Sequence, residues 1–468
     1  MQDFEADANR VRDWIASYRA SIESLPVLSA IHPGDVLRRL PERPPEQPET
    51  LEALLADLDS VILPGLTHWN HPGFMAYFCS STAEPGILAE FVTAALNVNA
   101  MLWRSAPAAT ELEERMVSWT REFVGLPPRF EGVIQDTASM SSLVALLAAR
   151  HHAVPGVRAH GLTGVDTPGR VYVSEHAHSS LDKAVIAAGL GHENLVRVAV
   201  DEVYAMRPDR LAAAIEEDVA AGRNPAMVCA TIGTASSTAV DPVAAIADVC
   251  ERLGVWLHVD AAYAGPAASV DELRHHFQGW ERADSIVLNP HKWMSVPLDC
   301  SLLLSPRLEV FRDSLALTPE YLRGEHDTTN LMDVGVALGR RFRALKLWFV
   351  FRMVGAEGLR SMIREHRALA LALAERIEAD PRFELAAPVP FSTVCFRALD
   401  PSGDPRRADV LNRELMAAVN LEGRVFLSHT ELDGRFTIRV AIGNVHTRRS
   451  HVEAGWDSVT RALDALSD

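Results

Sequence analysis

The chain has 468 residues, a length that suits one large domain accompanied by a smaller one. Hydrophobic residues make up 48% and charged residues 23% of it, a globular balance that excludes disorder as the main state. The formal net charge of −17 comes without a basic stripe, which argues against a nucleic-acid-binding protein.

Cysteine usage and the apolar runs indicate where the protein works. The 5 cysteines are scattered and form no CxxC pair, so neither a disulfide framework nor a cysteine metal site is predicted. The acidic first residues lack the apolar core of a secretory signal. No apolar run approaches the ~20 residues that a membrane helix needs. We therefore expect a cytoplasmic protein that does not cross a membrane.

The N-terminal region is predicted to be helical. Residues 5–25 carry apolar side chains at helical spacing, namely Val11, Trp14, Ile15, Tyr18, Ile22 and Leu25. Such a helix packs either on its own core or on a partner subunit. A proline-rich linker over 41–48 precedes a second helix at about 50–62, and a turn-rich stretch follows it over 64–85.

From residue 84 to 306, short β-rich runs alternate with helical periodicity. The predicted strands are 132–134, 171–173, 195–198, 227–232, 255–259, 285–288 and 301–304, with helices such as 141–150, 209–221 and 242–253 between them. This alternation, with nearly continuous apolar strands, indicates a mostly parallel sheet with helices on both faces. In such sheets the ligand lies beyond the carboxyl ends of the strands, so functional residues are sought there.

The rest of the chain is predicted to form a compact C-terminal α/β region. A long helix covers about 340–375. Short strands at 391–397 and 436–441 alternate with helices at 407–420 and 450–466. No internal repeat is present.

Two of the predicted strands end in residues that suit pyridoxal phosphate (PLP). Asp260 follows the strand 255–259, and a carboxylate buried there needs a cationic partner. Lys292 follows the next strand, and a desolvated lysine serves as an amine nucleophile. PLP requires this pair, because a lysine forms its Schiff base and an acid keeps its pyridine nitrogen protonated. A helix cap for Asp260 and a surface position for Lys292 are the plainer alternatives.

A phosphate site and a histidine are predicted at neighbouring strand ends. Residues 135–139 open a helix, whose N–H groups, with the hydroxyls of Thr137 and Ser139, form an anion site. His291, beside the lysine, is a second phosphate donor. His178 lies past the strand 171–173, where it can stack on the cofactor ring, whereas His176 is expected to be an ordinary loop residue. No third ligand accompanies these two histidines, so a zinc site is not predicted.

Several segments resemble the signatures of the group II PLP decarboxylases, and most of all those of the aromatic-L-amino-acid decarboxylases. The segments Leu-His-Val-Asp-Ala-Ala-Tyr-Ala-Gly at 257–265 and Asn-Pro-His-Lys-Trp at 289–293 carry the resemblance. Further segments agree with it, at 68–74, 105–113, 132–135, 177–180 and 338–348. The resemblance covers nearly the whole chain and implies PLP-dependent transferase fold type I, similar to aspartate aminotransferase. It also implies an N-terminal dimerisation segment (1–83), a large PLP-binding domain (84–345) and a small C-terminal domain (346–468).

The resemblance implies a role for each site residue. Lys292 corresponds to the Schiff-base lysine and Asp260 to the partner of the ring nitrogen, with Ala262 under one ring face and His178 over the other. Tyr321 matches a mobile-loop tyrosine that protonates the substrate Cα. The implied cofactor contacts also include Thr137, Ala138, Ser139, Ala235, Asn289 and His291, with Leu338 where a partner subunit approaches the phosphate. The implied substrate pocket comprises Trp69, Tyr77, Phe78, Ser80, Met101 and Gly339, of which Met101 falls where the neighbouring subunit adds an apolar side chain.

Three departures from the family pattern stand out. Gly233-Thr-Ala235 replaces Gly-Thr-Thr, so one hydroxyl near the ring edge is lost unless Ser236 takes its role. Cys79 stands where a proline is common. The stretch between Tyr321 and Gly339 is shorter than in animal members.

The expected activity is decarboxylation of an aromatic L-amino acid to an arylalkylamine, in a homodimer with shared active sites. Tyr321 and His178 are both present, which favours plain decarboxylation over oxidative aldehyde formation. An apolar pocket suits an aromatic substrate better than glutamate, for which Arg104 is the one cationic candidate. Aldehyde synthesis, glutamate decarboxylation and a non-catalytic scaffold remain the alternatives.

Overall fold

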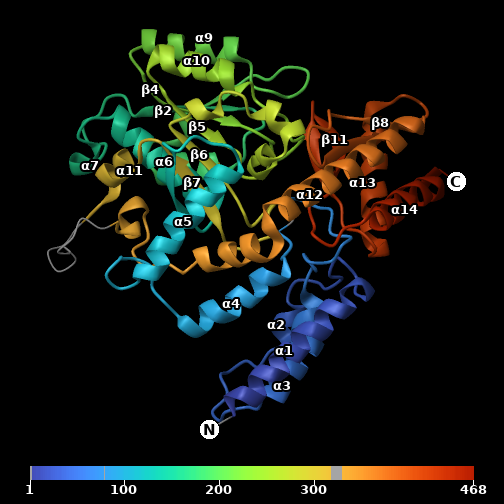
Figure 1. The fold of residues 1–468 in the computed structure, drawn as a ribbon. Coiled ribbons are helices and arrows are strands. Elements are labelled where there is room, and N and C mark those ends of the chain that lie inside the picture. The colour runs from blue at the N-terminus through green and yellow to red at the C-terminus, as the bar shows by residue number, and fades with distance from the viewer. Residues whose placement is uncertain (1–2, 79, 318–328, 468) are drawn as a thin grey trace.

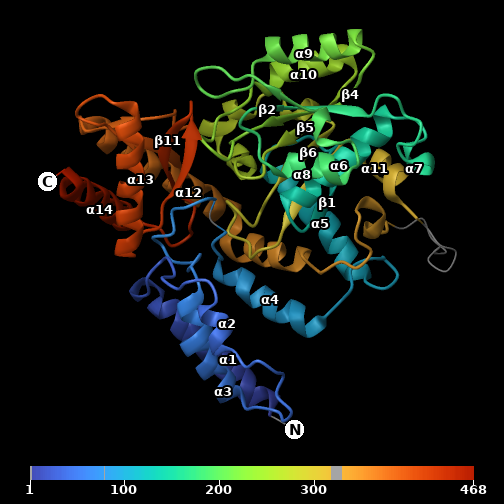
Figure 2. The same cartoon turned by 180° about the vertical axis from the view of Figure 1, so that it is seen from behind.

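The structure is a computed structural model that describes residues 3–78, 80–317 and 329–467. Figures 1 and 2 show a large lobe built on a central sheet, a small lobe beside it, and N-terminal helices that project from both. We call the seven-stranded sheet with the helices packed on it the large lobe, and the four-stranded sheet with its helices the small lobe. The two sheets confirm the predicted fold class.

The large lobe is built on a mostly parallel sheet in the order β1-β7-β6-β5-β4-β2-β3. Strand β7 pairs antiparallel with β1 and β6, and the other pairs are parallel. All seven strands lie where the sequence predicts them. Their bounds are β1 Glu131–Gln135, β2 Gly169–Ser174, β3 Leu195–Val198, β4 Asn224–Thr231, β5 Trp256–Asp260, β6 Ser285–Leu288 and β7 Ser301–Ser305.

Both faces of this sheet are covered, which explains why its central strands read as continuous apolar runs. All five residues of β5 are buried; Leu257 and Val259 pack into one core cluster and Trp256 into another. The helices of the large lobe and the linking region are α4 Glu84–Leu96, α5 Pro107–Phe123, α6 Ala138–Ala153, α7 Val157–His160, α8 Ser180–Ala187, α9 Pro208–Ala220, α10 Val243–Leu253 and α11 Leu308–Leu315. Neither α4 nor α5 was predicted from the sequence. Apolar side chains lie on several sides of α4, so it has no clear amphipathic period.

The small lobe contains an antiparallel sheet in the order β10-β11-β9-β8. Strands β9 and β11 were predicted, whereas the short β8 and the polar β10 were not. The elements are α12 Ala344–Ala379, β8 Phe383–Leu385, β9 Thr393–Ala398, α13 Pro405–Glu422, β10 Ser428–Leu432, β11 Arg435–Ala441 and α14 Arg449–Ser467. Helix α12 contacts both lobes and breaks at Gly355, whose φ is 77°. The predicted boundary between 345 and 346 falls within α12, and the three-domain division stays a prediction.

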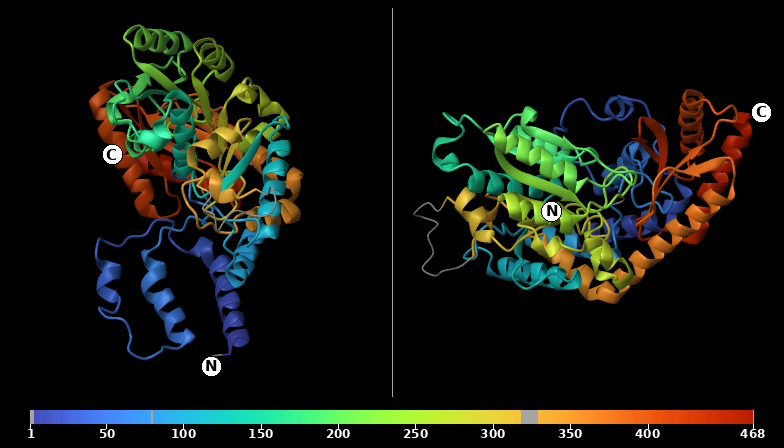
Figure 3. Two further views of the ribbon diagram at one scale, coloured as in Figure 1. Left: turned by 90° about the vertical axis from the view of Figure 1, so that its left-hand side faces the viewer. Right: turned by 90° about the horizontal axis from the view of Figure 1, so that it is seen from above.

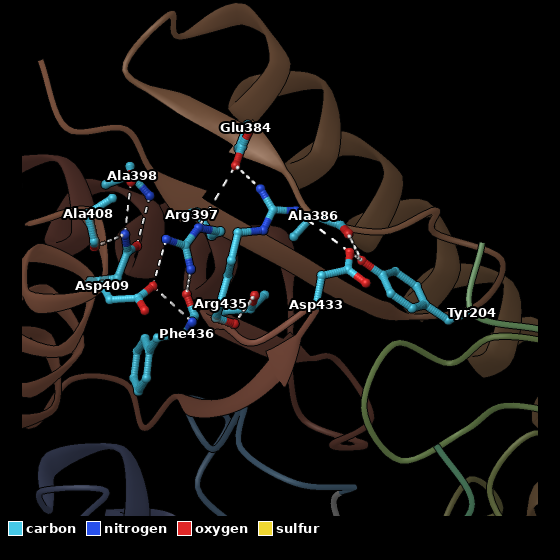
Figure 4. Close-up of polar contacts among 12 residues, drawn as sticks. Tyr204, Glu384, Ala386, Arg397, Ala398, Ala408, Asp409, Asp433, Arg435 and Phe436 are labelled. Carbon is cyan, nitrogen blue, oxygen red and sulfur yellow. Dashed lines mark hydrogen bonds and ion pairs between the residues drawn. The ribbon is translucent and has the colours of Figure 1, made fainter. Parts of the chain in front are cut away.

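Polar contacts join the small sheet to its helix and to the large lobe (Figure 4). Arg397, on β9, is buried, pairs with Asp409 of α13 at 2.8 Å and donates to the Phe436 carbonyl. Tyr204, which follows β3 in the large lobe, donates its hydroxyl proton to Asp433 at 2.8 Å. The β10–β11 hairpin is therefore attached to the large lobe.

The N-terminal helices α1 Phe4–Ser21, α2 Asp35–Arg39 and α3 Leu51–Asp57 lie side by side and away from the two sheets (Figure 3). Helix α1 has no buried residue, although Trp14 donates to Asp59 at 2.7 Å and Tyr18 contacts His68 at 3.0 Å. Both predicted N-terminal helices are present. Among the residues that the structure describes, no helix combines the length and apolarity needed to cross a membrane.

A buried ion pair ties the chain that precedes α12 to the large sheet. Arg340 donates to Glu113 of α5 at 2.6 Å and to the Ile134 carbonyl of β1 at 2.7 Å. The same Glu113 carboxylate accepts from the Ile134 N–H at 2.8 Å. Both side chains are nearly inaccessible to solvent, so each depends on the other for neutralisation.

Glu113→Ala is expected to lower the free energy of unfolding by about 3–5 kcal/mol, because it leaves the Arg340 charge buried without its partner. Glu114→Ala is the matched control, since Glu114 is exposed on the same helix, and it should change stability by less than about 0.5 kcal/mol. Urea denaturation followed by tryptophan fluorescence measures both variants. Equal effects from the two substitutions would contradict this role of the pair.

Candidate active site

The carboxyl ends of the parallel strands converge on one cavity of ≈ 200 Å³. Asp260 ends β5, Thr231 ends the neighbouring β4, and Lys292 follows β6 on the other side. The lining residues are Phe78, Thr137, Ala138, Ser139, His178, Ser180, Thr231, Gly233, Ala235, Asp260, Ala262, Tyr263, Asn289, His291 and Lys292. Parallel pairing of β4, β5 and β6 produces this convergence of residues far apart in sequence.

Asp260 is held rigidly at the base of the cavity. Its side chain is buried, and Oδ1 accepts a hydrogen bond from the Ala262 N–H at 3.0 Å. The Ala262 carbonyl in turn accepts from the Asn289 N–H at 3.0 Å, and the Asn289 carbonyl accepts from the Lys292 N–H at 2.9 Å. This chain of backbone hydrogen bonds fixes the loop after β5 against the loop after β6.

Lys292 is the chain's one lysine that faces this cavity. Burial lowers its pKa, the Asp260 charge opposes that effect and the Arg439 charge adds to it. The sequence contains two other lysines. Lys183 is exposed on α8, and the buried Lys346 pairs with Glu90 at 2.6 Å. A lowered pKa leaves more of the Lys292 amine neutral and therefore nucleophilic.

The opposite end of the cavity suits an anion. Thr137 precedes α6, and the first residues of this 16-residue helix, Ala138 and Ser139, line the cavity. The N–H groups at the start of a helix have no partner within the helix and can therefore bind an anion. Burial lowers the pKa of His291 to about 3, so its ring is neutral. His291 Nδ1 accepts from the Cys300 N–H at 2.9 Å, which leaves Nε2 to carry the ring proton.

His178 follows β2 and is oriented by its own loop. Its Nδ1 accepts from the Ser180 N–H at 3.1 Å and lies 2.9 Å from the Ser180 hydroxyl oxygen. The ring proton therefore resides on Nε2. Burial lowers the pKa of His178, while the Asp260 charge opposes that shift, so the imidazole is neutral at physiological pH.

A stack of aromatic rings, which the sequence analysis missed, supports Lys292. The rings of Phe78 and Tyr263 are stacked with centroids 3.9 Å apart, and Trp293 follows at 4.8 Å from Tyr263. The Arg439 guanidinium lies over the outer face of Phe78 at 4.5 Å, and Lys292 Nζ is 5.1 Å from the same ring. Arg439 interrupts the otherwise apolar end of β11, and this is the one feature of the sequence that could have marked it as functional. Its contacts could not be predicted, because they come from distant segments.

Arg439 is a buried cation near Lys292, whereas the sequence suggested only Arg104 as a cationic candidate. Its Nη1 donates to the Tyr77 carbonyl at 2.5 Å and its Nε to the Ser236 carbonyl at 3.1 Å. Nη2 is buried and has no hydrogen-bond partner among the described residues. The charge thus retains one unused donor close to Lys292.

Most predicted substrate residues lie outside the cavity lining. Trp69 and Tyr77 stack at 6.0 Å and are largely exposed, whereas Phe78 lines the cavity. Hydrogen bonds between Ala100 and Arg340 bring the segments of Met101 and Gly339 together. Ser80 and Leu338 also lie outside the lining, and Leu338 is exposed. Tyr321 and Cys79 lie outside the described residues.

Comparison with known proteins identifies the family. The model of the pyridoxal-dependent decarboxylase conserved domain matches residues 33–399. The chain belongs to this family. It is 41% identical to tryptophan decarboxylase 2 of Oryza sativa subsp. japonica over 98% of this chain and 95% of that protein. It is also 41% identical to a phenylacetaldehyde synthase of Arabidopsis thaliana, over 97% and 94% of the two chains.

A solved structure of this decarboxylase family is similar throughout. The crystal structure of Oryza sativa TDC with PLP and tryptamine has a TM-score of 0.96 to this chain at 36% identity, covering 100% of this chain and 98% of that one. This chain is accordingly a PLP-dependent amino acid decarboxylase of fold type I. Its cavity fits the cofactor, because an amine, a carboxylate and an anion site line one space.

The three lysines permit a direct test of the cofactor-bearing residue. Borohydride reduction of the PLP-loaded protein should leave the reduced cofactor on the peptide that contains Lys292, as read by mass spectrometry. Lys292→Ala should also abolish the visible absorption band, since neither Lys183 nor Lys346 lines the cavity. Lys183→Ala is the control and should keep it. Attachment at Lys183 or Lys346 would contradict the assignment.

Proposed function

We propose that this decarboxylase converts an aromatic L-amino acid of the DOPA, tryptophan, phenylalanine or tyrosine type into the corresponding arylalkylamine and CO2. The observation that carries the proposal is the single cavity in which Lys292, Asp260 and His178 converge. The relatives named for tryptophan decarboxylation and for aldehyde synthesis from aromatic compounds support the substrate class.

The proposed roles follow from the placement of each group. Lys292 holds the cofactor aldehyde, and Asp260 pairs with the ring nitrogen. When bound, PLP supplies a protonated ring that accepts the electron pair left at the substrate Cα. His178 and Ala262 would both contact the cofactor ring, and the neutral Nε2–H of His178 would donate a hydrogen bond to the substrate. The residues that would hold the phosphate are Thr137, Ala138, Ser139, Asn289 and His291, and Ala235 would contact the cofactor ring.

The remaining predicted residues are proposed to contact the substrate or the partner subunit. Phe78 and the exposed Trp69 and Tyr77 offer apolar area to an aromatic side chain. The unused Arg439 donor is proposed to hold the substrate carboxylate. Tyr321 is proposed to protonate the Cα, which favours amine over aldehyde. The further residues proposed for the substrate pocket and its subunit boundary are Ser80, Met101, Leu338 and Gly339.

Product analysis tests the reaction. Purified enzyme with DOPA, tryptophan, phenylalanine or tyrosine should release amine and CO2 in equal amounts, without aldehyde or hydrogen peroxide. His178→Gln should lower kcat by about 10²–10⁴-fold, because the positioned ring N–H is lost. The control Lys183→Ala should retain full turnover. Stoichiometric aldehyde and peroxide would instead establish the aldehyde synthase alternative. Turnover of glutamate alone would instead establish the glutamate decarboxylase alternative.

We infer that the enzyme is a homodimer whose subunits meet at α4. Four apolar side chains on one face of α4, Leu88, Phe91, Val92 and Leu96, are each at least 40% exposed. A groove of ≈ 560 Å³ lies between α4 and the unburied helix α1. Contiguous exposed apolar surface of this kind is typical of subunit contacts. The N-terminal segment 1–83 is proposed to lie on the partner.

Phe91→Asp is expected to convert the dimer into a monomer, because it places a charge in the proposed contact. Size-exclusion chromatography with light scattering measures the mass. Val219→Asp on α9 is the matched control, since Val219 is an equally exposed apolar residue of the large lobe, and it should leave the dimer intact. A native chain that elutes as a monomer would contradict the proposal.

A cytoplasmic location is proposed as well. Cys229, Cys250, Cys300 and Cys395 are all free thiols buried in the structure. Unpaired cysteines suit a reducing compartment.

A further inference from the structure

One hydroxyl in the cavity lacks a partner that the protein itself provides. Thr231, the last residue of β4, is only 4% exposed and lines the cavity. Its Oγ1 has no hydrogen-bond partner in the part of the chain that the structure describes. A buried hydroxyl without a partner is destabilising, whereas valine would fill the same volume at no polar cost. The retained hydroxyl therefore points to a ligand atom.

Apart from Ser139, which lies at the start of α6 and is assigned to the phosphate, the other hydroxyls of the cavity wall already have partners. Thr137 donates to Asp136 at 3.0 Å, and the Ser180 oxygen lies 2.9 Å from His178 Nδ1. The Tyr263 hydroxyl is 2.6 Å from the Ser392 hydroxyl, outside the cavity.

The hydroxyls of the loop that follows β4 are likewise paired with other parts of the protein. Thr234 Oγ1 accepts from the Ala239 N–H at 3.0 Å, and Thr238 donates to the Ser237 carbonyl at 2.6 Å. Ala235 lines the cavity but has no hydroxyl. Ser236, which the sequence analysis considered as a substitute, accepts from Thr430 of the small lobe at 2.9 Å. Thr231 is thus the free hydroxyl on this side of the site.

The position of Thr231 is fixed by its backbone. Its N–H donates to Asp241 Oδ2 at 2.7 Å, and its carbonyl accepts from the Asp241 N–H at 2.9 Å. Thr231 is also the register partner of Asp260 across the parallel β4–β5 pair. Register partners point to the same face of a sheet, so the Thr231 and Asp260 side chains lie on the same face.

We propose that Thr231 is a further cofactor-binding residue, whose hydroxyl donates a hydrogen bond to the phenolic oxygen of PLP. The inference rests on the proposed site. There, Asp260 takes the ring nitrogen, Lys292 the aldehyde and the start of α6 the phosphate. The phenolic oxygen is then the remaining polar group of the cofactor, and in its ionised form it is a strong acceptor for a neutral hydroxyl.

The experiment compares Thr231→Val with Thr231→Ser in the full-length protein. A hydrogen bond donated to the phenolic oxygen favours its ionised form, so its loss raises the pH at which the visible band of the bound cofactor titrates. Thr231→Val should raise that pH and weaken PLP binding by about 10- to 100-fold in equilibrium dialysis. Thr231→Ser should match the native protein in both measurements.

Thr93→Val is the control, because Thr93 on α4 is another buried hydroxyl without a partner but lies outside the cavity. It should leave the titration and the affinity unchanged. Native titration and affinity in Thr231→Val would overturn the inference, and so would a Thr231→Ser variant that behaves like Thr231→Val, since shape alone would then explain the effect. A native protein that binds no PLP, or a Lys292→Ala variant that keeps the band, would instead overturn the proposed site.

Discussion

The parallel pairing of β4, β5 and β6 is the constraint on which the site depends. It places a carboxylate, an amine and a hydroxyl at the ends of neighbouring strands, and the sheet is buried on both faces. Two opposite effects act on the pKa of Lys292 at this site. Burial lowers the pKa of Lys292, whereas the nearby Asp260 charge raises it. A bound PLP can engage the Lys292 amine through its aldehyde and the Asp260 carboxylate through its ring nitrogen.

Much of this arrangement could be predicted from the sequence because it is local. Asp260, Lys292 and His178 each follow a short apolar run, and the rule that ligands bind at strand carboxyl ends identifies them without knowledge of the tertiary contacts. The seven strands of the large lobe were predicted for the same reason. The short β8 and the polar β10 lack an apolar period and were missed.

The residues that could not be predicted depend on long-range packing. Arg439 reaches the site from β11, more than 140 residues beyond Lys292, and contacts Phe78 from a segment before α4. Ser236 is adjacent in sequence to a cavity residue, yet its hydroxyl contacts the small lobe. The sequence predicts Thr231 in a strand and Ser236 after it, but it does not show that the Thr231 hydroxyl is the one left without a partner. The tertiary contacts separate these two cases, because Ser236 meets Thr430 of the small lobe and Thr231 lies in register with Asp260.

The scarcity of lysine has a practical consequence for handling this enzyme. Of the three lysine amines, one faces the cofactor cavity, one is buried in an ion pair and only Lys183 is exposed. Amine-directed reagents under mild conditions will therefore attach to the folded chain at α8 or at its amino terminus. Dyes, spin labels and solid supports can then be coupled at one defined internal point on the large lobe.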